Sequence, residues 1–474
     1  MNTQDTICAI ATAQGGAIGV IRISGKDAIA ITDRIFTPVG KHPLPLSERK
    51  AYTMAFGHIR QDDGEIIDEV LIGLFKSPHS YTGEDCVEIS CHGSSFILQQ
   101  VMQLLIRKGC RAAGPGEFTQ RAFLNGKMDL SQAEAVADLI ASSSAATHRM
   151  AMNQMRGGFS RELSALRERL LHLTSLMELE LDFSDHEELE FADRSELETI
   201  AGDIEKVISG LVHSFSVGNV LKNGIPVAIV GETNAGKSTL LNTLLNEEKA
   251  IVSDIHGTTR DVIEDTVNLS GITFRFIDTA GIRDTHDTIE NMGIARSFHK
   301  MEQAEIVLWV VDNTCAEAQI RQLSPRILPL CSNKQLIILL NKSDQVSAVP
   351  TKLSGLPENT VTLSISAKEK TGIQELQNLL VKTASVPELT SSDLIVTNVR
   401  HYEALSLALE DIHRVQNGLQ THLSGDFISQ DLRECLFHLA EIVGGEITAD
   451  EVLGNIFMKF CIGKCWLVNS HKQP

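Results

Sequence analysis

The run of eight residues from Gly231 to Ser238 constrains this chain more than any other feature. It reads Gly-Glu-Thr-Asn-Ala-Gly-Lys-Ser and fits the phosphate-binding pattern GxxxxGK[ST] at every fixed position. Glycines let the backbone curl so that N–H groups point at phosphate oxygens, and the following helix adds positive partial charge at its N-terminus. An apolar run from Ile225 to Val230 precedes the loop, and leucines at helical spacing follow it. The pattern therefore predicts a nucleotide site between a buried strand and a helix.

Within this loop, each polar side chain has an expected role. Lys237 is predicted to meet the β- and γ-phosphates, and the hydroxyl of Ser238 is predicted to bind Mg²⁺, a cation that prefers oxygen ligands. Asn234 has two readings that its sequence position leaves open. It either serves the turn geometry of the loop or offers a side-chain carbonyl to a monovalent cation beside the phosphates.

Further motifs follow in the order of a GTPase. Gly257-Thr258-Thr259-Arg260-Asp261 takes the place of a first switch, in which the Thr259 hydroxyl closes on Mg²⁺ when a γ-phosphate is present. Asp278-Thr279-Ala280-Gly281 follows an expected strand near Thr273 and forms the second switch. Ile282 stands where many small GTPases have a glutamine that orients the attacking water, so hydrolysis must be organised in another way.

Two more segments predict which base is bound. In Asn341-Lys342-Ser343-Asp344, the Asp344 carboxylate can accept two hydrogen bonds from guanine N1–H and its amine, which adenine cannot supply. Ser366-Ala367-Lys368 is expected to direct a backbone N–H toward guanine O6. These motifs lie at strand ends, where open α/β sheets bind ligands. The sequence therefore predicts a GTPase domain that binds GTP rather than ATP.

Length and charge set limits on the rest of the chain. A chain of 474 residues exceeds one hydrophobic core, so several domains are expected. The formal net charge of −19 argues against a surface coated for nonspecific nucleic-acid binding, although a localised basic patch can still hold an RNA. Nine scattered cysteines without paired CxxC spacing indicate a reducing compartment and no structural zinc. No apolar run is long enough to cross a membrane and no secretory signal is evident, so we expect a cytoplasmic protein without membrane contact.

The texture of the sequence changes along the chain. Residues 1–120 mix expected strands at Ala17 to Ile23, Glu69 to Phe75 and Cys86 to Cys91 with short helices, which predicts an α+β domain. Residues 121–217 are helical, with a third bundle helix expected near Glu196 to Phe215.

Residues 218–384 alternate strands, near 225, 273, 306, 336 and 361, with helices, which predicts a doubly wound sheet. Helical texture returns over residues 385–474, through Leu405 to Leu419 and Leu432 to Val443. The predicted fold class is multidomain α/β, with a Ras-like P-loop GTPase domain inserted into a helical bundle. The mixed signs of Arg161, Glu162, Arg167, Glu168 and Arg169 predict a solvated helix face without a function of its own.

The whole pattern resembles the MnmE/TrmE family of tRNA-modification GTPases. Besides the P-loop, the likeness rests on the run from Ile251 to Asp261, the segment from Pro115 to Asn125, and Cys461-Ile462-Gly463-Lys464. The last two are specific to the family, and the resemblance covers nearly the whole chain. It implies a folate-binding-like α+β domain at the N-terminus that forms a homodimer.

The resemblance also implies roles at the nucleotide. K⁺ would be surrounded by Asn234, Ser253, Ile255 and Thr258, and Mg²⁺ would be held by Ser238 and Thr259. Glu290 would position the attacking water through a second water. The residues expected around GTP are Asn234, Ala235, Gly236, Lys237, Ser238, Thr239, Ser253, Ile255, Thr258, Thr259, Asp278, Thr279, Ala280, Gly281, Asn341, Lys342, Asp344, Ser366, Ala367 and Lys368.

The modification chemistry is likewise implied by the resemblance. A tetrahydrofolate derivative, 5-formyl- or methylene-tetrahydrofolate, would be contacted by Arg22, Glu88, Lys127 and Lys464, and Cys461 would take part in the chemistry as an activated thiol. An FAD-dependent partner protein would share the tRNA and form a hetero-oligomer with this chain. Together they would add a carboxymethylaminomethyl or aminomethyl group at C5 of the wobble uridine.

Two other functions are weighed against this one. A ribosome-assembly GTPase that only gates RNA binding would carry a KH-like basic GxxG loop after the GTPase domain, and no GxxG occurs after Ala384. A purely regulatory GTPase would depend on an external activating protein.

Overall fold

The computed structural model describes residues 5–13, 15–40, 43–182, 194–249, 265–277, 301–332, 334–346, 356–357, 360–384 and 394–445. By their contacts these residues form two compact units. The first comprises the described residues within Met1–Ile140, Met152–Ile204 and Leu407–Pro474, and the second those within Ala141–Ala151 and Glu205–Ser406. The predicted domain boundaries near residues 120, 217 and 384 stay predictions.

The first unit contains a seven-stranded sheet in the order β3-β4-β5-β6-β2-β1-β7. Its strands are β1 (Ile7–Ile10), β2 (Ile18–Ser24), β3 (Phe36–Pro38), β4 (Thr53–Arg60), β5 (Ile66–Phe75), β6 (Cys86–His92) and β7 (Arg111–Ala112). Helices α1 (Ala28–Asp33) and α2 (Ser95–Arg107) share one apolar core with these strands. The three strands expected in this region are confirmed within a few residues as β2, β5 and β6.

A buried arginine fixes the segment after this sheet. Helix α3 (Glu117–Leu124) carries Arg121, whose side chain is 3% exposed. Its guanidinium donates to the carboxylates of Asp5 at 2.6 Å, Glu117 at 3.1 Å and Glu84 at 3.2 Å. A buried charge is tolerated when it is paired and hydrogen-bonded in this way. Arg121 therefore ties the segment from Pro115 to Asn125 to the residues that lead into β1 and β6.

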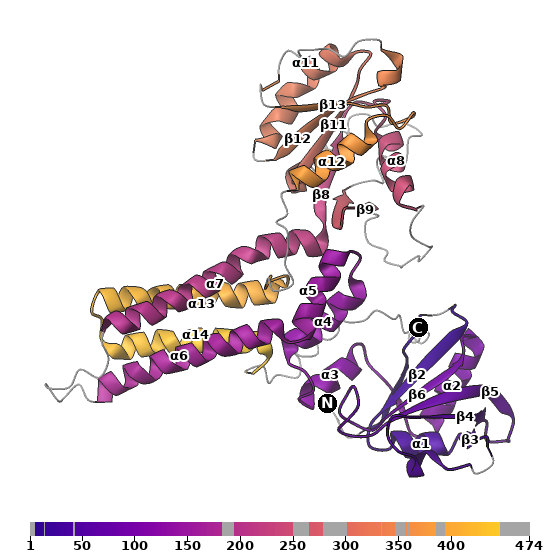
Figure 1. Ribbon diagram of the computed structural model, residues 1–474. Helices are drawn as coiled ribbons and strands as arrows, with labels where there is room; N and C mark the ends of the chain where they lie inside the picture. The colour runs from indigo at the N-terminus through magenta and orange to yellow at the C-terminus, as the bar shows by residue number, and fades with distance from the viewer. Residues whose placement is uncertain are drawn as a thin grey trace, which may run out of the picture. The chain divides into compact units, whose positions relative to one another are not determined.

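Helices make up the rest of the first unit and continue into the second. They are α4 (Leu130–Ala141), α5 (Ala145–Met155), α6 (Gly158–Asp182), α7 (Arg194–Asn223), α13 (Val399–Gln420) and α14 (Gly425–Val443). Helix α6 packs along α14, as Figure 1 shows. The apolar stripe of α6 is buried at Leu163, Leu166, Leu170, Leu173 and Met177, as its helical spacing predicts.

The second unit contains a six-stranded sheet in the order β13-β12-β11-β8-β10-β9. Its strands are β8 (Ile225–Val230), β9 (Asp265–Leu269), β10 (Ile272–Phe276), β11 (Ile306–Asp312), β12 (Gln335–Asn341) and β13 (Val361–Ser364). Helices α8 (Lys237–Lys249) and α12 (Ile373–Thr383) share one core with the sheet, and α11 (Ala316–Ile327) shares the core of the other face. This is the predicted doubly wound arrangement, so the fold class is confirmed.

Two local expectations need correction. Strand β9 was not expected, and it pairs antiparallel with β10 through the turn at Ser270 and Gly271, which have φ of 52° and 85°. Helix α7 runs to Asn223 rather than ending near Phe215. Gly218 lies within this helix, and a Cβ there would lie 2.1 Å from the Val396 carbonyl oxygen, so glycine permits a close backbone contact at this position.

Candidate functional site

The loop after β8 has the backbone shape that phosphate binding requires. Gly231 and Gly236 have φ of 147° and 98°, a region that favours glycine. A Cβ on Gly231 would lie 2.2 Å from the Val310 carbonyl oxygen, and a Cβ on Gly236 would lie 2.1 Å from Nδ2 of Asn341. Only glycine fits at either position. The curled loop that leads into α8 therefore fits the phosphates of a nucleotide.

Lys237 is turned back onto this loop. Its ammonium donates to the carbonyl oxygens of Gly231 at 2.8 Å and Glu232 at 2.7 Å. Burial lowers the pKa of Lys237, and the nearby Glu232 carboxylate opposes that shift. Asn234 is exposed at the loop tip with φ of 64°, a conformation that asparagine tolerates well. Both readings of Asn234 remain compatible with this geometry.

Asn341 joins the phosphate loop to the base-binding segment. Its side chain is buried, its Nδ2 donates to the Ala235 carbonyl at 2.8 Å, and its Oδ1 accepts from the Ala367 N–H at 3.0 Å. The Thr243 hydroxyl of α8 also donates to the Ala367 carbonyl at 2.9 Å. Two motifs that are more than 100 residues apart in sequence are thus fixed to each other by buried hydrogen bonds. The Ala367 N–H, one of the backbone donors in the segment predicted to face guanine O6, bonds to Asn341 in this structure.

Asp344 lies where the sequence predicts base readout. Its Oδ1 accepts from the Ser366 hydroxyl at 2.6 Å, which orients the carboxylate. The neighbouring Lys342 forms an ion pair with Asp312 at 2.5 Å. Burial opposes ionisation of Asp312, but hydrogen bonds from Lys342 and Thr314 outweigh it and lower the pKa of that carboxyl. The three motif segments that the structure describes therefore meet at the carboxyl edge of the sheet.

One contact at this edge was not predicted from the sequence. Gln319 of α11 is buried, and its Nε2 donates to the Glu232 carboxylate at 2.9 Å. Its Oε1 accepts from the Asp312 N–H at 2.9 Å. Gln319 therefore ties the second residue of the phosphate loop to the end of β11. No local motif marks it, because its partners lie on other elements.

The remaining predicted nucleotide and catalytic residues, and the predicted folate contact Lys464, lie outside the described residues. These are Ser253, Ile255, Thr258, Thr259, Asp278, Thr279, Ala280, Gly281, Glu290, Cys461 and Lys464. Ser238 and Thr239 lie in the first turn of α8, beside Lys237. The described part of the site is thus the phosphate loop and the base-binding edge.

A second cluster lies on the N-terminal sheet. Arg22 of β2 and Glu88 of β6 face each other in register, and Nη2 of Arg22 lies 2.7 Å from the Glu88 carboxylate. The Arg22 guanidinium lies 5.2 Å from the Tyr81 ring centre and 5.8 Å from that of Phe118. The family resemblance predicts Arg22 and Glu88 as folate contacts, and the structure pairs these two side chains with each other. Tyr81 and Phe118 were not predicted, because nothing in their spacing links them to Arg22.

Lys127 borders the same loop as Tyr81. Its ammonium donates to the Pro78 carbonyl at 2.9 Å, and Asn125 donates to the Thr82 carbonyl at 2.7 Å. A Cβ on Gly83 would lie 3.3 Å from the Lys127 side chain, so the loop and Lys127 are closely packed. Of the four predicted folate contacts, the structure thus describes three, and they gather around the loop of residues 77–84. Lys464 lies outside the described residues.

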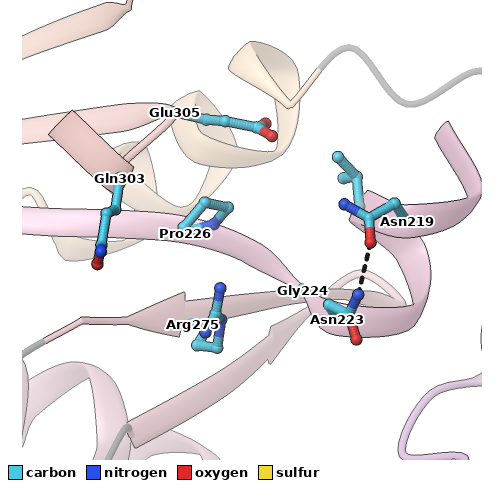
Figure 2. A pocket seen from close by; sticks show the side chains of 8 residues that line it. Asn219, Asn223, Gly224, Pro226, Arg275, Gln303 and Glu305 are labelled. Carbon is cyan, nitrogen blue, oxygen red and sulfur yellow. Dashed lines mark hydrogen bonds between the residues drawn. The ribbon is translucent and has the colours of Figure 1, made fainter. Parts of the chain in front are cut away.

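A cavity of about 580 Å³ lies at the opposite edge of the second sheet (Figure 2). Pro226 at the start of β8, Glu305 just before β11, and Arg275 line it. These are the amino ends of β8 and β11, whereas ligands of open α/β sheets bind at carboxyl ends. The cavity is therefore separate from the nucleotide edge.

The glycine cradle, the buried Asn341 bridge and the placement of Asp344 at one sheet edge define the class of P-loop GTPases. A family model described as the MnmE helical domain matches residues 130–461, and one described as the GTP-binding protein TrmE N-terminus matches residues 6–127. The chain belongs to the MnmE/TrmE family.

Two relatives named tRNA modification GTPase MnmE match nearly the whole chain. The tRNA modification GTPase MnmE of Bacteroides thetaiotaomicron is 67% identical over 97% of this chain and 100% of that protein. The protein of the same name from Flavobacterium johnsoniae is 52% identical over 98% of this chain and 100% of that protein. Among solved structures, Aquifex aeolicus Era bound to GDP.AlF4- is 28% identical and covers 39% of this chain and 66% of that chain, with a TM-score of 0.26. That low score adds nothing to the fold derived from the strand order.

Membrane crossing was also considered for the helices. Among the described residues, no helix combines the length and the apolar character that a bilayer span needs.

Proposed function

We propose that this chain is a potassium-activated GTPase of tRNA modification. With an FAD-dependent partner it adds a carboxymethylaminomethyl or aminomethyl group at C5 of the wobble uridine, using a one-carbon unit from 5-formyl- or methylene-tetrahydrofolate. The observation that carries the proposal is that one chain of this family holds both a guanine-nucleotide edge and the Arg22–Glu88 cluster. The modification takes place in the cytoplasm, where tRNA and reduced thiols occur.

The described residues have defined tasks at the nucleotide. The loop of Gly231 to Gly236 receives phosphates through its backbone N–H groups, Lys237 adds positive charge, and Asp344 selects guanine. Two cations would supply positive charge where negative charge develops during hydrolysis. Mg²⁺ would be held by Ser238 and Thr259, and K⁺ by Asn234, Ser253, Ile255 and Thr258. Glu290 would position the attacking water. Asn341 keeps the phosphate and base segments at a fixed separation.

The cation mechanism has a direct kinetic test. Purified protein should hydrolyse GTP rapidly in KCl and slowly in NaCl at equal ionic strength, and Asn234→Ala should remove the difference. Thr233→Ala, a change at the neighbouring exposed loop position, is the matched control and should keep the preference for K⁺. Equal wild-type rates in the two salts would reject potassium activation.

The modification is tested in cells and in solution. Mass spectrometry of tRNA from cells lacking the gene should show loss of the wobble-uridine group, and unchanged nucleosides would reject the proposed function. In calorimetry, Arg22→Ala should weaken binding of 5-formyl-tetrahydrofolate by about tenfold or more, since it removes a charge-assisted hydrogen-bond donor. Its affinity for GTP should not change.

The homodimer is supported by an apolar face on the N-terminal sheet. Tyr52, Met54, Phe56 and Leu71 are 66%, 63%, 49% and 37% exposed, and Phe56 pairs directly with Leu71. Outward positions of an exposed strand are usually polar, so a continuous apolar face marks an interaction surface. Met54→Asp with Phe56→Asp should yield monomers in sedimentation equilibrium. A dimer that survives both changes would place the interface elsewhere.

A further inference from the structure

Two arginines line an open cavity in the first unit, apart from the Arg22–Glu88 cluster. The cavity has a volume of about 420 Å³ and forms where α5 ends and α6 begins, against the start of α4. Its polar lining consists of Gln132, Arg156, Ser160, Arg161, Ser164 and Glu168. None of these residues has a role in the proposed nucleotide or folate sites.

The backbone between α5 and α6 brings the two arginines together. Gly157 has φ of 74° and its N–H donates to the Gln154 carbonyl at 2.9 Å, which ends α5 and reverses the chain. One turn into α6, Nη1 of Arg161 donates to the Arg156 carbonyl at 2.9 Å. This bond orients the Arg161 guanidinium and leaves its other donors available, since an arginine carries five. Arg156 and Arg161 therefore sit on the same rim.

The charge of this region is unbalanced. Residues 139–161 contain Arg149, Arg156 and Arg161 but neither Asp nor Glu, in a chain of net charge −19. Within the described residues, neither Arg156 nor Arg161 forms an ion pair with a carboxylate. The first turn of α6 has no acidic residue, so Arg161 stands at the positive end of a helix dipole without compensation. An anion in the cavity would relieve that repulsion.

The neighbouring side chains suit a phosphate. The hydroxyls of Ser160 and Ser164 add neutral donors, and Ser160 already lies 3.1 Å from the Ser131 hydroxyl. The Gln132 amide on the same lining donates to the Met155 carbonyl at 3.3 Å. Arginine matches phosphate oxygens with paired N–H groups. Two arginines along an open rim suit successive phosphates of a polymer better than one small ion. Glu168 is the one carboxylate of the described lining, and it opposes an anion there.

We propose that Arg156 and Arg161 bind the phosphodiester backbone of the tRNA. This inference rests on the proposed function, and it assigns the kind of localised basic patch with which a chain of net charge −19 can still hold an RNA. The arginines hold RNA without reading its sequence, because phosphate contacts position a nucleic acid and base contacts specify it. The expectation of a plain solvated helix face is thereby revised for Arg161, while Arg167 and Arg169 keep that interpretation.

The test compares two double variants of the full chain. Arg156→Ala with Arg161→Ala removes the proposed contacts, and Arg167→Ala with Arg169→Ala removes the same charge from exposed positions of α6 outside the cavity. Fluorescence anisotropy with an unmodified tRNA transcript measures affinity over a salt series. The first pair should lower affinity about tenfold or more, and should reduce the slope of log affinity against log salt by about 1.4 to 1.8. The second pair should change affinity less than about threefold, and Glu168→Gln should strengthen binding.

The outcomes separate this inference from the proposed function. Equal losses in both double variants would mean that only net charge matters, which overturns the assignment and leaves tRNA modification standing. Calorimetry with inorganic phosphate tests whether the cavity binds a free anion instead of tRNA. If the first pair loses phosphate binding without a change in tRNA affinity, the assignment is also overturned. A wild-type chain that binds no tRNA overturns it as well, whereas GTP hydrolysis and wobble-nucleoside analysis decide the proposed function independently. Unchanged GTP hydrolysis and melting temperature establish that the variants are folded.

Discussion

The nucleotide edge and the Arg22–Glu88 cluster are held in place in different ways. At the nucleotide edge, backbone groups are fixed by buried hydrogen bonds, above all by Asn341, whose side chain reaches both Ala235 and Ala367. In the N-terminal cluster, Arg22 and Glu88 are 29% and 31% exposed and meet across two strands as side chains. The first site is therefore built from backbone shape and the second from side-chain chemistry. Substitutions should consequently damage the first through geometry and the second through the loss of single groups.

Gly236→Ala should have the largest effect. Its Cβ would lie 2.1 Å from Asn341 Nδ2, so the loop must shift. Affinity for GTP should then fall at least about 100-fold, because the backbone N–H groups no longer point at the phosphates. Gly271→Ala is the matched control: its φ of 85° gives similar backbone strain, but no atom lies within 4 Å of the added Cβ. It should lower stability only. Calorimetry with GDP and GTP measures the nucleotide affinity of each variant. Equal affinities for the two variants would contradict a site built from backbone shape.

Asn341→Ala should follow in size. It leaves the Ala235 carbonyl and the Ala367 N–H without their buried partner, at about 1–3 kcal/mol for each group, so guanine-nucleotide affinity should fall about 30-fold or more. The preference for guanine over adenine should survive, because Asp344 keeps its bond from Ser366. Competition between GTP and ATP measures that preference. Loss of selectivity together with affinity would assign Asn341 to base readout rather than to positioning.

Gln319→Leu should have an intermediate effect. Without Gln319, the Glu232 carboxylate loses the donor that holds it at 2.9 Å and is free beside the incoming phosphates, so GTP affinity should fall about 5- to 30-fold. Gln322→Leu on the exposed side of α11 makes the same substitution without that contact and should be neutral. In a Glu232→Gln background, Gln319→Leu should have a smaller effect. Equal losses in both backgrounds would show that charge repulsion is not the cause.

The difference between the nucleotide edge and the Arg22–Glu88 cluster also explains which residues could be predicted from the sequence. The phosphate loop and Asp344 were predictable, because nucleotide binding demands particular residues at fixed local spacing. Arg22 and Glu88 were found only through family resemblance, since their pairing depends on the register of β2 with β6. The Gln319–Glu232 contact spans 87 residues of sequence and leaves no local pattern. The continuation of α7 beyond Phe215 was not predicted, and Gly218 within that part packs against Val396, which lies far away in sequence.

The smallest effect is expected for the ion pair of the N-terminal cluster. In a double-mutant cycle with Arg22→Ala and Glu88→Ala, urea unfolding should give a coupling energy of about 0.2–1 kcal/mol, because water screens a pair that is about one-third exposed. GTP affinity should be unchanged in all three variants. A coupling well above that range would mean that the pair is a structural element of the sheet like the buried Arg121 network. A small coupling combined with lost folate binding would instead mean that Arg22 and Glu88 are retained for their ligand, which is the expected property of a site built from side chains.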